Sequence, residues 1–361
     1  MHNILALDLG RHNQKTHGAT FTHLGGRGPR LTCSTNEVGL TEVFQAAITA
    51  GVTAVYFEAQ PSAFRVADLA RAHGLKPVIA NTHAEGFAAR ARSTKSDKLD
   101  VDRLGGMALR GDIVGIHIPD ANDRDRRSLV ELRASLVGDQ TATKNRIRGL
   151  AEQHWWDLPD GEACWSKDGL ASLRAKTKDR HCRQSLRAHL GILLDQLQAV
   201  AKQIDKADAA LAQLREDTPE ARRLIDELPG FGQVTTDAFM AFVGNPKKTG
   251  HSSRSAAAIT GLAPTQRQSG KTMIPGPISK AGNATMRGYL VEAAHQAVIR
   301  YPEWRAMKER LTKGKDDPVT KGKAIVAVAR RLAQTAAALL RSGKPYNPER
   351  IMPKHTWSPM T

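Results

Sequence analysis

The first 112 residues alternate between short apolar runs and amphipathic patterns with helical spacing. Apolar runs of four to eight residues bounded by turn residues are typical of buried strands, whereas a three-to-four-residue repeat indicates a helix. Gly74 follows the second helical pattern, where glycine commonly ends a helix. These patterns predict strands at 3–9, 18–24, 30–35, 52–59 and 76–80, and helices at about 40–50, 62–74 and 97–110.

The order of these elements is β-β-β-α-β-α-β-α. Strands that alternate with helices pack as an α/β layer structure, with helices covering the sheet. We therefore predict an α/β domain of the ribonuclease-H or RuvC-like type over residues 1–112.

The pattern changes after residue 112, where two long helical stretches replace the strands. Apolar residues recur at helical spacing among charged ones in the first stretch, and a second runs over about 181–216. An aromatic connector, "HWWDLPDGEACW", joins them. We predict a coiled-coil arm over 113–217 with a structural or oligomeric role. Its basic residues are alternative contacts for a nucleic acid backbone: Arg124, Arg126, Arg127, Lys144, Arg146 and Arg148.

Residues 218–345 form a third, mainly helical unit. The stretch 224–244 reads as a helix, a Gly-x-Gly turn and a second helix, which resembles the DNA-binding helix-hairpin-helix. Gly230 and Gly232 would let backbone N–H groups approach a phosphate at the start of the second helix. Further helices are predicted at 284–300 and 323–342. The Pro-rich tail, 346–361, has the composition of a disordered segment.

The charge indicates a polyanionic partner. Lys and Arg number 53 against 36 Asp and Glu, which gives a net charge of +17. Such a surplus favours nucleic acid, although a basic enzyme of another kind has the same balance. No apolar stretch approaches the ~18 residues of a membrane span, and the N-terminus lacks signal-peptide features. We expect a cytoplasmic protein without a membrane partner. The three widely spaced cysteines indicate neither a disulfide framework nor a zinc site.

Four carboxylates occupy positions suited to metal binding. Asp8 and Glu58 lie near the ends of predicted strands, and Asp97 and Asp100 share one face of a predicted helix. Asp102 is rotated away from them. Buried acids need a partner, and four converging carboxylates can hold two Mg²⁺ ions. Actin-like sugar kinases also begin with a strand, an acid and a glycine, but no second phosphate-binding strand follows here.

The segment "TQRQSGKT" (265–272) ends like a P-loop, yet Thr265 stands where that motif needs glycine. What is left is Ser269, set between Arg267 and Lys271, two cations that would favour a phosphodiester and its transition state. Serine is a weak nucleophile without a base or metal to activate it. A nucleophilic serine and a simple phosphate contact are both open on this evidence.

Three strings together carry a family resemblance: "LPGFGQVTTDAFMAFVGN", "GLAPTQRQSGKT" and "GPISKAGNATMRGYLVEAA". With the four acids, the chain resembles the DEDD transposases of the insertion-sequence-110 family over nearly its whole length. The resemblance implies a RuvC-like domain, a coiled coil and a C-terminal domain with a catalytic serine. That serine maps onto Ser269, with Ser279 as the alternative.

The resemblance also implies how the protein works. Such enzymes move their element through a circular intermediate, and a structured non-coding RNA pairs with donor and target DNA. The serine is taken to form a covalent phosphoserine link beside metal-binding acids, here Asp8, Glu58, Asp97 and Asp100. By charge and position, the nucleic acid contacts would be Arg267, Lys271, Lys280 and Arg287.

We therefore predict an RNA-guided DNA recombinase that acts as a dimer or tetramer. Two alternatives are a RuvC-like junction nuclease that hydrolyses DNA with metal-activated water, and a non-catalytic nucleic-acid-binding regulator.

Overall fold

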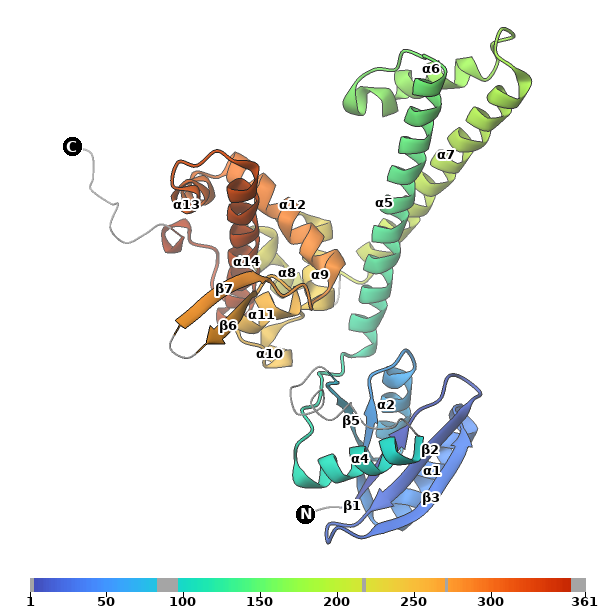
Figure 1. Ribbon diagram of the computed structural model, residues 1–361, viewed down its shortest axis with the longest axis vertical. Helices are drawn as coiled ribbons and strands as arrows, with labels where there is room; N and C mark the ends of the chain where they lie inside the picture. The colour runs from blue at the N-terminus through green and yellow to red at the C-terminus, as the bar shows by residue number, and fades with distance from the viewer. Residues whose placement is uncertain (1–2, 83–96, 216–218, 270–271, 352–361) are drawn as a thin grey trace, which may run out of the picture. The chain divides into compact units, whose positions relative to one another are not determined.

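The computed structural model describes residues 3–82, 97–215, 219–269 and 272–351. Within these ranges, the side chains of residues 97, 98, 248, 266–269 and 272–275 lie outside the description. The chain divides into two compact units, Met1–Pro119 and Asp120–Thr361 (Figure 1). No helix among the described residues is both long enough and apolar enough to cross a membrane.

The first unit is built on a five-stranded sheet with the strand order β3-β2-β1-β4-β5. Strands β1, β2 and β3 pair antiparallel, whereas β1, β4 and β5 pair parallel. The strands are β1 (Asn3–Asp8), β2 (Lys15–Phe21), β3 (Arg27–Ser34), β4 (Val52–Glu58) and β5 (Lys76–Ala80), and the helices are α1 (Glu37–Thr49), α2 (Ala63–Ala72) and α4 (Asp97–Arg110). The predicted order of elements is confirmed.

Both faces of this sheet are buried, because successive strand residues point to opposite sides. Leu5 and Leu7 of β1 belong to the core that contains α1 and α2. Ile4 and Ala6 belong instead to the core on the α4 side. Each parallel strand therefore reads as a continuous apolar run, as expected for a sheet covered on both faces.

The second unit begins with the predicted pair of long helices, α5 (Ala121–Gln153) and α7 (Gln184–Gln213), which run side by side in Figure 1. Asp120 caps α5 by accepting a hydrogen bond from the Asp123 N–H. At the far end of the pair lie a short 3₁₀ turn, η1 (Gly161–Trp165), and α6 (Lys167–Lys176).

Several basic residues of α5 serve the fold. Arg126 is 1% exposed and donates to Asp123 and to the Leu214 carbonyl. Arg127 donates to the Ala241 carbonyl of α9. Lys144 and Arg148 lie over the Trp165 ring. The prediction of a nucleic acid contact is therefore wrong for Arg126, because its guanidinium is buried and already bonded.

The rest of the second unit is a helical domain that shares a core with the base of the arm, through Val130 of α5 and Leu211 of α7. This core contains residues on both sides of the domain boundary predicted at residue 217. That boundary stays a prediction. Its elements are α8 (Pro219–Asp226), α9 (Gln233–Phe242), α10 (Pro246–Thr249), α11 (Ser253–Ile259), β6 (Pro264–Ser269), β7 (Thr272–Ile278), α12 (Ala284–Arg300), α13 (Pro302–Thr312), α14 (Pro318–Ser342) and η2 (Pro348–Arg350).

Three features of this domain refine the predictions. Residues 265–269 and residue 272 belong to two antiparallel strands, β6 and β7, and not to an irregular loop. The last long helix begins at Pro318, because Asp317 caps it by accepting from the Thr320 N–H. Helix α13 was not predicted, since its charged residues mask a helical pattern that buries Trp304.

The start of the tail is packed against this domain. The Tyr346 hydroxyl accepts from Trp304 Nε1 at 2.9 Å and donates to Glu303 at 2.8 Å, and Ile351 is buried. The prediction of disorder is therefore wrong for residues 346–351. Residues 352–361 lie outside the described residues.

Candidate active site

Asp8 and Glu58 end two neighbouring parallel strands. In the register of β1 and β4, Leu7 lies opposite Phe57, so the next position along the two strands brings Asp8 beside Glu58. Parallel strands end at the same edge of a sheet, and neighbouring side chains in register point to the same side. The two acids therefore share one edge of the sheet.

They also share one face, the one covered by α4. Ile4 and Ala6 of β1, and Ala54 and Tyr56 of β4, pack on the α4 side. Two-residue periodicity continues this face to Asp8 and Glu58. Asp8 is half-buried and Glu58 is exposed, as expected at the rim of a core.

Helix α4 contributes the other two acids. Val101 and Leu104 are buried against the sheet, and Asp100 beside them is half-buried. Asp97 is the first residue of α4 and precedes Val101 by one turn, so helix geometry puts position 97 on the same stripe. The side chain of Asp97 lies outside the description. The prediction that residues 97 and 100 lie on one helix is confirmed, and their roles as metal ligands stay a prediction.

Gly105 allows α4 to lie close to the sheet. A Cβ atom at this position would come within 2.2 Å of the Phe21 ring on β2. Only glycine fits this contact without a shift of the helix or the ring. The spacing between the helix that carries Asp100 and the strands that carry Asp8 and Glu58 therefore depends on Gly105.

Asp102 has a different role, as predicted. Its carboxylate accepts hydrogen bonds from Arg27 at 2.9 Å and Arg30 at 2.7 Å, both on β3. Helix geometry turns it away from the stripe of Val101 and Leu104. It ties α4 to the edge of the sheet.

His17 is a further residue at this edge that the sequence analysis missed. It lies opposite Asp8 in the β1–β2 register. Ala19 and Phe21 of the same strand pack on the α4 side, so His17 belongs to the same face as Asp8. The predicted strand began at residue 18, whereas the alternation of buried and half-buried residues begins at Thr16.

The loops that follow the two acids are tied together. Gln60, just after β4, donates from Nε2 to the Gly10 carbonyl at 3.3 Å. The Gly10 N–H in turn donates to Thr16 Oγ1 at 3.2 Å, and Thr16 bonds the buried Thr35 at 2.7 Å. These bonds hold the strand ends, and thus the acids, in a defined place.

The donor set of this edge fits a hard divalent cation, because Mg²⁺ and its analogues prefer carboxylate oxygens. Asp8, Glu58 and Asp100 would supply these oxygens together with Asp97. Among the side chains that the structure describes, no group of three or more His, Cys, Asp or Glu residues forms a metal site. Asp8, Glu58 and Asp100 therefore do not form such a group by themselves, and the side chain of Asp97, which the predicted site also requires, lies outside the description.

Ser269 is the last residue of β6 and lies opposite Thr272 of β7. Its side chain and that of Arg267 lie outside the description, as do Gly270 and all of Lys271. Their predicted roles stay predictions. The backbone of Ser269 is at the end of β6, and that of Thr272 begins β7.

Two glycines, Gly261 before β6 and Gly282 after β7, shape the backbone at the base of this hairpin. Gly261 has a φ of +67°, and a Cβ at Gly282 would lie 2.0 Å from the Ile259 carbonyl oxygen. Arg287 of α12 donates to the carbonyls of Thr260 and Gly282. The predicted nucleic acid contact Arg287 is thus bonded to the protein backbone. Gly261 and Gly282 therefore allow the backbone before β6 to lie close to the backbone after β7.

The other predicted contacts differ in their surroundings. Lys280 and Ser279 are exposed beyond β7. Gly232 caps α9, and a Cβ there would meet no atom within 4 Å. Gly230 has a φ of +82°, and a Cβ there would lie 2.1 Å from the Ala293 carbonyl of α12. Close packing against α12 therefore accounts for glycine at position 230.

Comparison with known families adds to this geometry. A model described as "Transposase" for the DEDD domain of IS110 elements matches residues 12–156. A model described as "Transposase IS116/IS110/IS902 family" matches residues 222–310, which include the hairpin. Over both matched segments, the chain is similar to DEDD transposases of the IS110/IS116/IS902 family.

Individual transposases show the same similarity. The chain is 26% identical over 256 residues to the transposase for insertion sequence element IS1111A of Coxiella burnetii, covering 71% of this chain and 69% of that protein. It is 26% identical over 317 residues to the putative transposase y4rJ of Sinorhizobium fredii, covering 78% and 75%. The pilin gene-inverting protein of Moraxella bovis is 28% identical over 159 residues, 42% of this chain and 48% of that protein.

These similarities assign the activity at a coarse level. The protein is a DNA transposase, and its DEDD domain implies a ribonuclease-H-like fold and dependence on a divalent metal. The in-register pair of Asp8 and Glu58 on the α4 face accords with that assignment.

Proposed function

We propose that this transposase excises and inserts an insertion sequence by cleaving and rejoining DNA strands through a covalent phosphoserine at Ser269. The observation that carries the proposal is the register of Asp8 and Glu58 at one sheet edge, on the face that α4 covers. The family match over residues 222–310, which include Ser269, supports the proposed role of that serine.

The four carboxylates would bind two Mg²⁺ ions. Bound there, the ions would activate a hydroxyl nucleophile and stabilise a leaving oxygen. The chain's own part is to hold Asp8 and Glu58 side by side through strand register, and Asp97 and Asp100 through α4. The Gln60–Gly10 bond keeps the two strand ends from separating.

In the covalent step, the Ser269 hydroxyl oxygen forms a bond to phosphorus, and one phosphate–deoxyribose ester bond breaks. The serine proton passes to a base, and the leaving oxygen takes up a proton to become a hydroxyl. Attack by that hydroxyl, or by one from another strand, reverses the step and rejoins DNA. Arg267 and Lys271 would balance the charge on the pentavalent phosphorus.

A structured RNA of the element would select the donor and target sequences by base pairing. The net charge of +17 suits a protein that holds both RNA and DNA. Holding two duplexes would require a dimer or tetramer, with the α5–α7 arm as an oligomeric element.

The experiment is to incubate the protein with guide RNA, Mg²⁺ and a donor duplex nicked so that cleaved ends diffuse apart. We expect a covalent adduct between protein and DNA that survives denaturation. Mass spectrometry of its peptides should place the attached phosphate on Ser269. Ser269→Ala should reduce adduct and strand exchange on the order of 10³-fold or more.

Ser279→Ala is the matched control, since Ser279 is exposed just beyond the hairpin and is the alternative serine. It should leave adduct formation unchanged. DNA cleavage without any adduct would show hydrolysis by a junction nuclease. Absence of cleavage with wild-type protein under all metal and RNA conditions would indicate a regulator.

A further inference from the structure

A cavity in the C-terminal helical domain is lined by arginines, and none of the predicted site residues lines it. It has a volume of about 430 Å³ and lies between α11, α14 and the segment that contains η2. Arg254 of α11, Arg331 of α14 and Arg350 of η2 line it, and all three are exposed. Three distant stretches of the chain thus bring positive charge to one hollow.

Among the residues that the structure describes, no carboxylate lines this cavity. Glu349 precedes Arg350 but is not part of the lining. Within the part of the chain that the structure describes, Arg254, Arg331 and Arg350 have no ion pair and no side-chain hydrogen bond. By contrast, the nearby Arg341 donates to the His251 carbonyl, and Arg222 binds the buried Asp237. The cavity therefore holds three positive charges that no described side chain neutralises.

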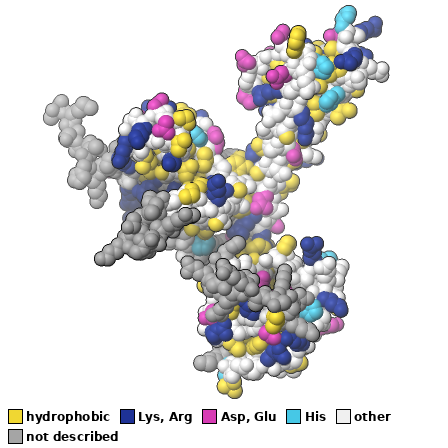
Figure 2. Space-filling view, viewed as in Figure 1, with side chains coloured by type: hydrophobic (Ala, Val, Ile, Leu, Met, Phe, Trp, Pro, Cys, Tyr) yellow, Lys and Arg dark blue, Asp and Glu magenta, His cyan; other side chains and the backbone are white. Residues whose placement is uncertain are grey.

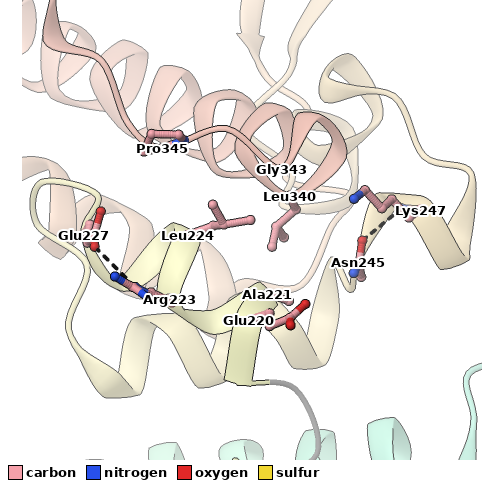
Figure 3. Close-up of a pocket in the computed structure, with 10 residues that line it drawn as sticks. All are labelled: Glu220, Ala221, Arg223, Leu224, Glu227, Asn245, Lys247, Leu340, Gly343 and Pro345. Atoms are coloured by element: carbon pink, nitrogen blue, oxygen red, sulfur yellow. Dashed lines mark hydrogen bonds and ion pairs between the residues drawn. The ribbon is translucent and has the colours of Figure 1, made fainter.

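A neighbouring cavity of about 540 Å³ shows the opposite balance (Figure 3). It is lined by Arg223 and Lys247 but also by Glu220 and Glu227, and Arg223 lies 4.0 Å from Glu227. Its charges compensate each other, so an anion gains little there. Figure 2 shows lysine and arginine side chains at several separate places on the visible face. The local balance of charge, and not the total charge, therefore distinguishes the two cavities.

The remaining lining residues indicate which anion fits. Gln334 and Asn347 provide side-chain amides, and the Asn347 oxygen already accepts from the Glu349 N–H, which leaves its NH₂ group as a donor. Tyr346 also lines the cavity, with its hydroxyl bonded to Trp304 and Glu303. Guanidinium groups bind phosphate with paired hydrogen bonds, and an aromatic residue offers a surface for a base.

We propose that this cavity binds the sugar–phosphate backbone of a nucleic acid strand through Arg254, Arg331 and Arg350. The site rests on the proposed function, because it requires a nucleic-acid-binding transposase. The site would extend the proposed nucleic-acid-binding surface beyond the β6–β7 hairpin. Helix α11, which carries Arg254, is joined to β6 through the turn at Gly261.

The test compares binding by full-length protein in a Ser269→Ala background, which prevents covalent capture. Labelled probes are a 20-nucleotide single-stranded RNA, the matching single-stranded DNA and the DNA duplex, each titrated at several salt concentrations. The variant replaces all three arginines by glutamine: Arg254→Gln, Arg331→Gln and Arg350→Gln. The matched control is Arg223→Gln in the neighbouring cavity, with melting temperatures to verify folding.

We expect the triple variant to bind at least one probe about tenfold or more weakly, with the salt slope reduced by about 2–3, one phosphate for each arginine. A loss of affinity confined to the RNA probe or to the DNA probes identifies which nucleic acid occupies the site. Affinities and slopes equal to those of the parent overturn the proposal, as does an equal loss per arginine in the Arg223→Gln control. If the parent protein binds none of the probes, the proposed function fails as well.

Discussion

Asp237 of α9 accepts a hydrogen bond of 2.6 Å from Arg222 of α8, and both side chains are buried. Arg215, just beyond α7, binds the same carboxylate at 2.6 Å. This hydrogen bond, above all, raises the pKa of Arg215. The Asp237 carboxylate of α9 therefore joins this helix both to α8 and to the end of the arm.

Removing that carboxylate should destabilise the domain strongly. Asp237→Ala leaves two arginines without their counter-charge, one of them buried, and such a loss costs about 3–5 kcal/mol. Urea unfolding followed by circular dichroism measures it. Asp195→Ala, which removes an exposed ion pair with Arg174, should cost at most about 1 kcal/mol. Equal losses in the two variants would contradict a structural role for the buried pair.

Gly105→Ala should weaken both folding and catalysis. The new methyl group would press on the Phe21 ring, so α4 would shift from the sheet at a cost of about 1–3 kcal/mol. Gly106→Ala is the control, because its Cβ would meet only the flexible end of Arg110, at 3.4 Å. Helix propensity predicts that this control is neutral or more stable by up to about 1 kcal/mol. Thermal melts and strand-exchange assays of both variants decide the question.

Asp8→Asn should abolish stabilisation by divalent metal. A ligand that binds the folded state at 100 times its Kd raises the free energy of unfolding by about 2.7 kcal/mol. We expect Mg²⁺ or Mn²⁺ to raise the melting temperature of the wild type and not of Asp8→Asn. Asp102→Asn loses its pairs with Arg27 and Arg30 yet should keep the metal response. A metal response in Asp8→Asn as large as in the wild type would remove Asp8 from the metal site.

Alkaline pH should release the Tyr346 contact. Burial, and then the hydrogen bond to Glu303, raise the pKa of Tyr346 above its ordinary value. Because the folded pKa is the higher one, this contribution to stability is complete below about pH 10, the usual tyrosine value. It is lost as the pH rises from there through the folded pKa.

Phenolate absorbance measures this effect among the four tyrosines. Tyr346→Phe should remove the tyrosine whose pKa is raised and flatten the stability loss above pH 10. Titration of all tyrosines at the ordinary pH in the folded wild type would contradict the buried hydrogen bond.

Much of the α/β domain could be predicted because its signals are local. The apolar runs that became β1, β4 and β5 differ from the predicted ranges by at most one residue at an end, and α4 was predicted at its observed bounds. The polar residues at the start of β2 gave a weaker signal, so β2 begins three residues before its predicted start and includes His17. The hairpin β6–β7 lacks an alternating apolar pattern and was interpreted as a loop.

By itself, the sequence determined the order of strands and helices, the acids at the strand ends and the basic charge, because periodicity and composition are properties of neighbouring residues. Only the tertiary structure decided which distant residues meet. It set His17 beside Asp8, buried Arg126, joined Asp237 to two arginines and gathered three others around one cavity. These relations depend on strand register and helix packing, which no local stretch of the chain encodes.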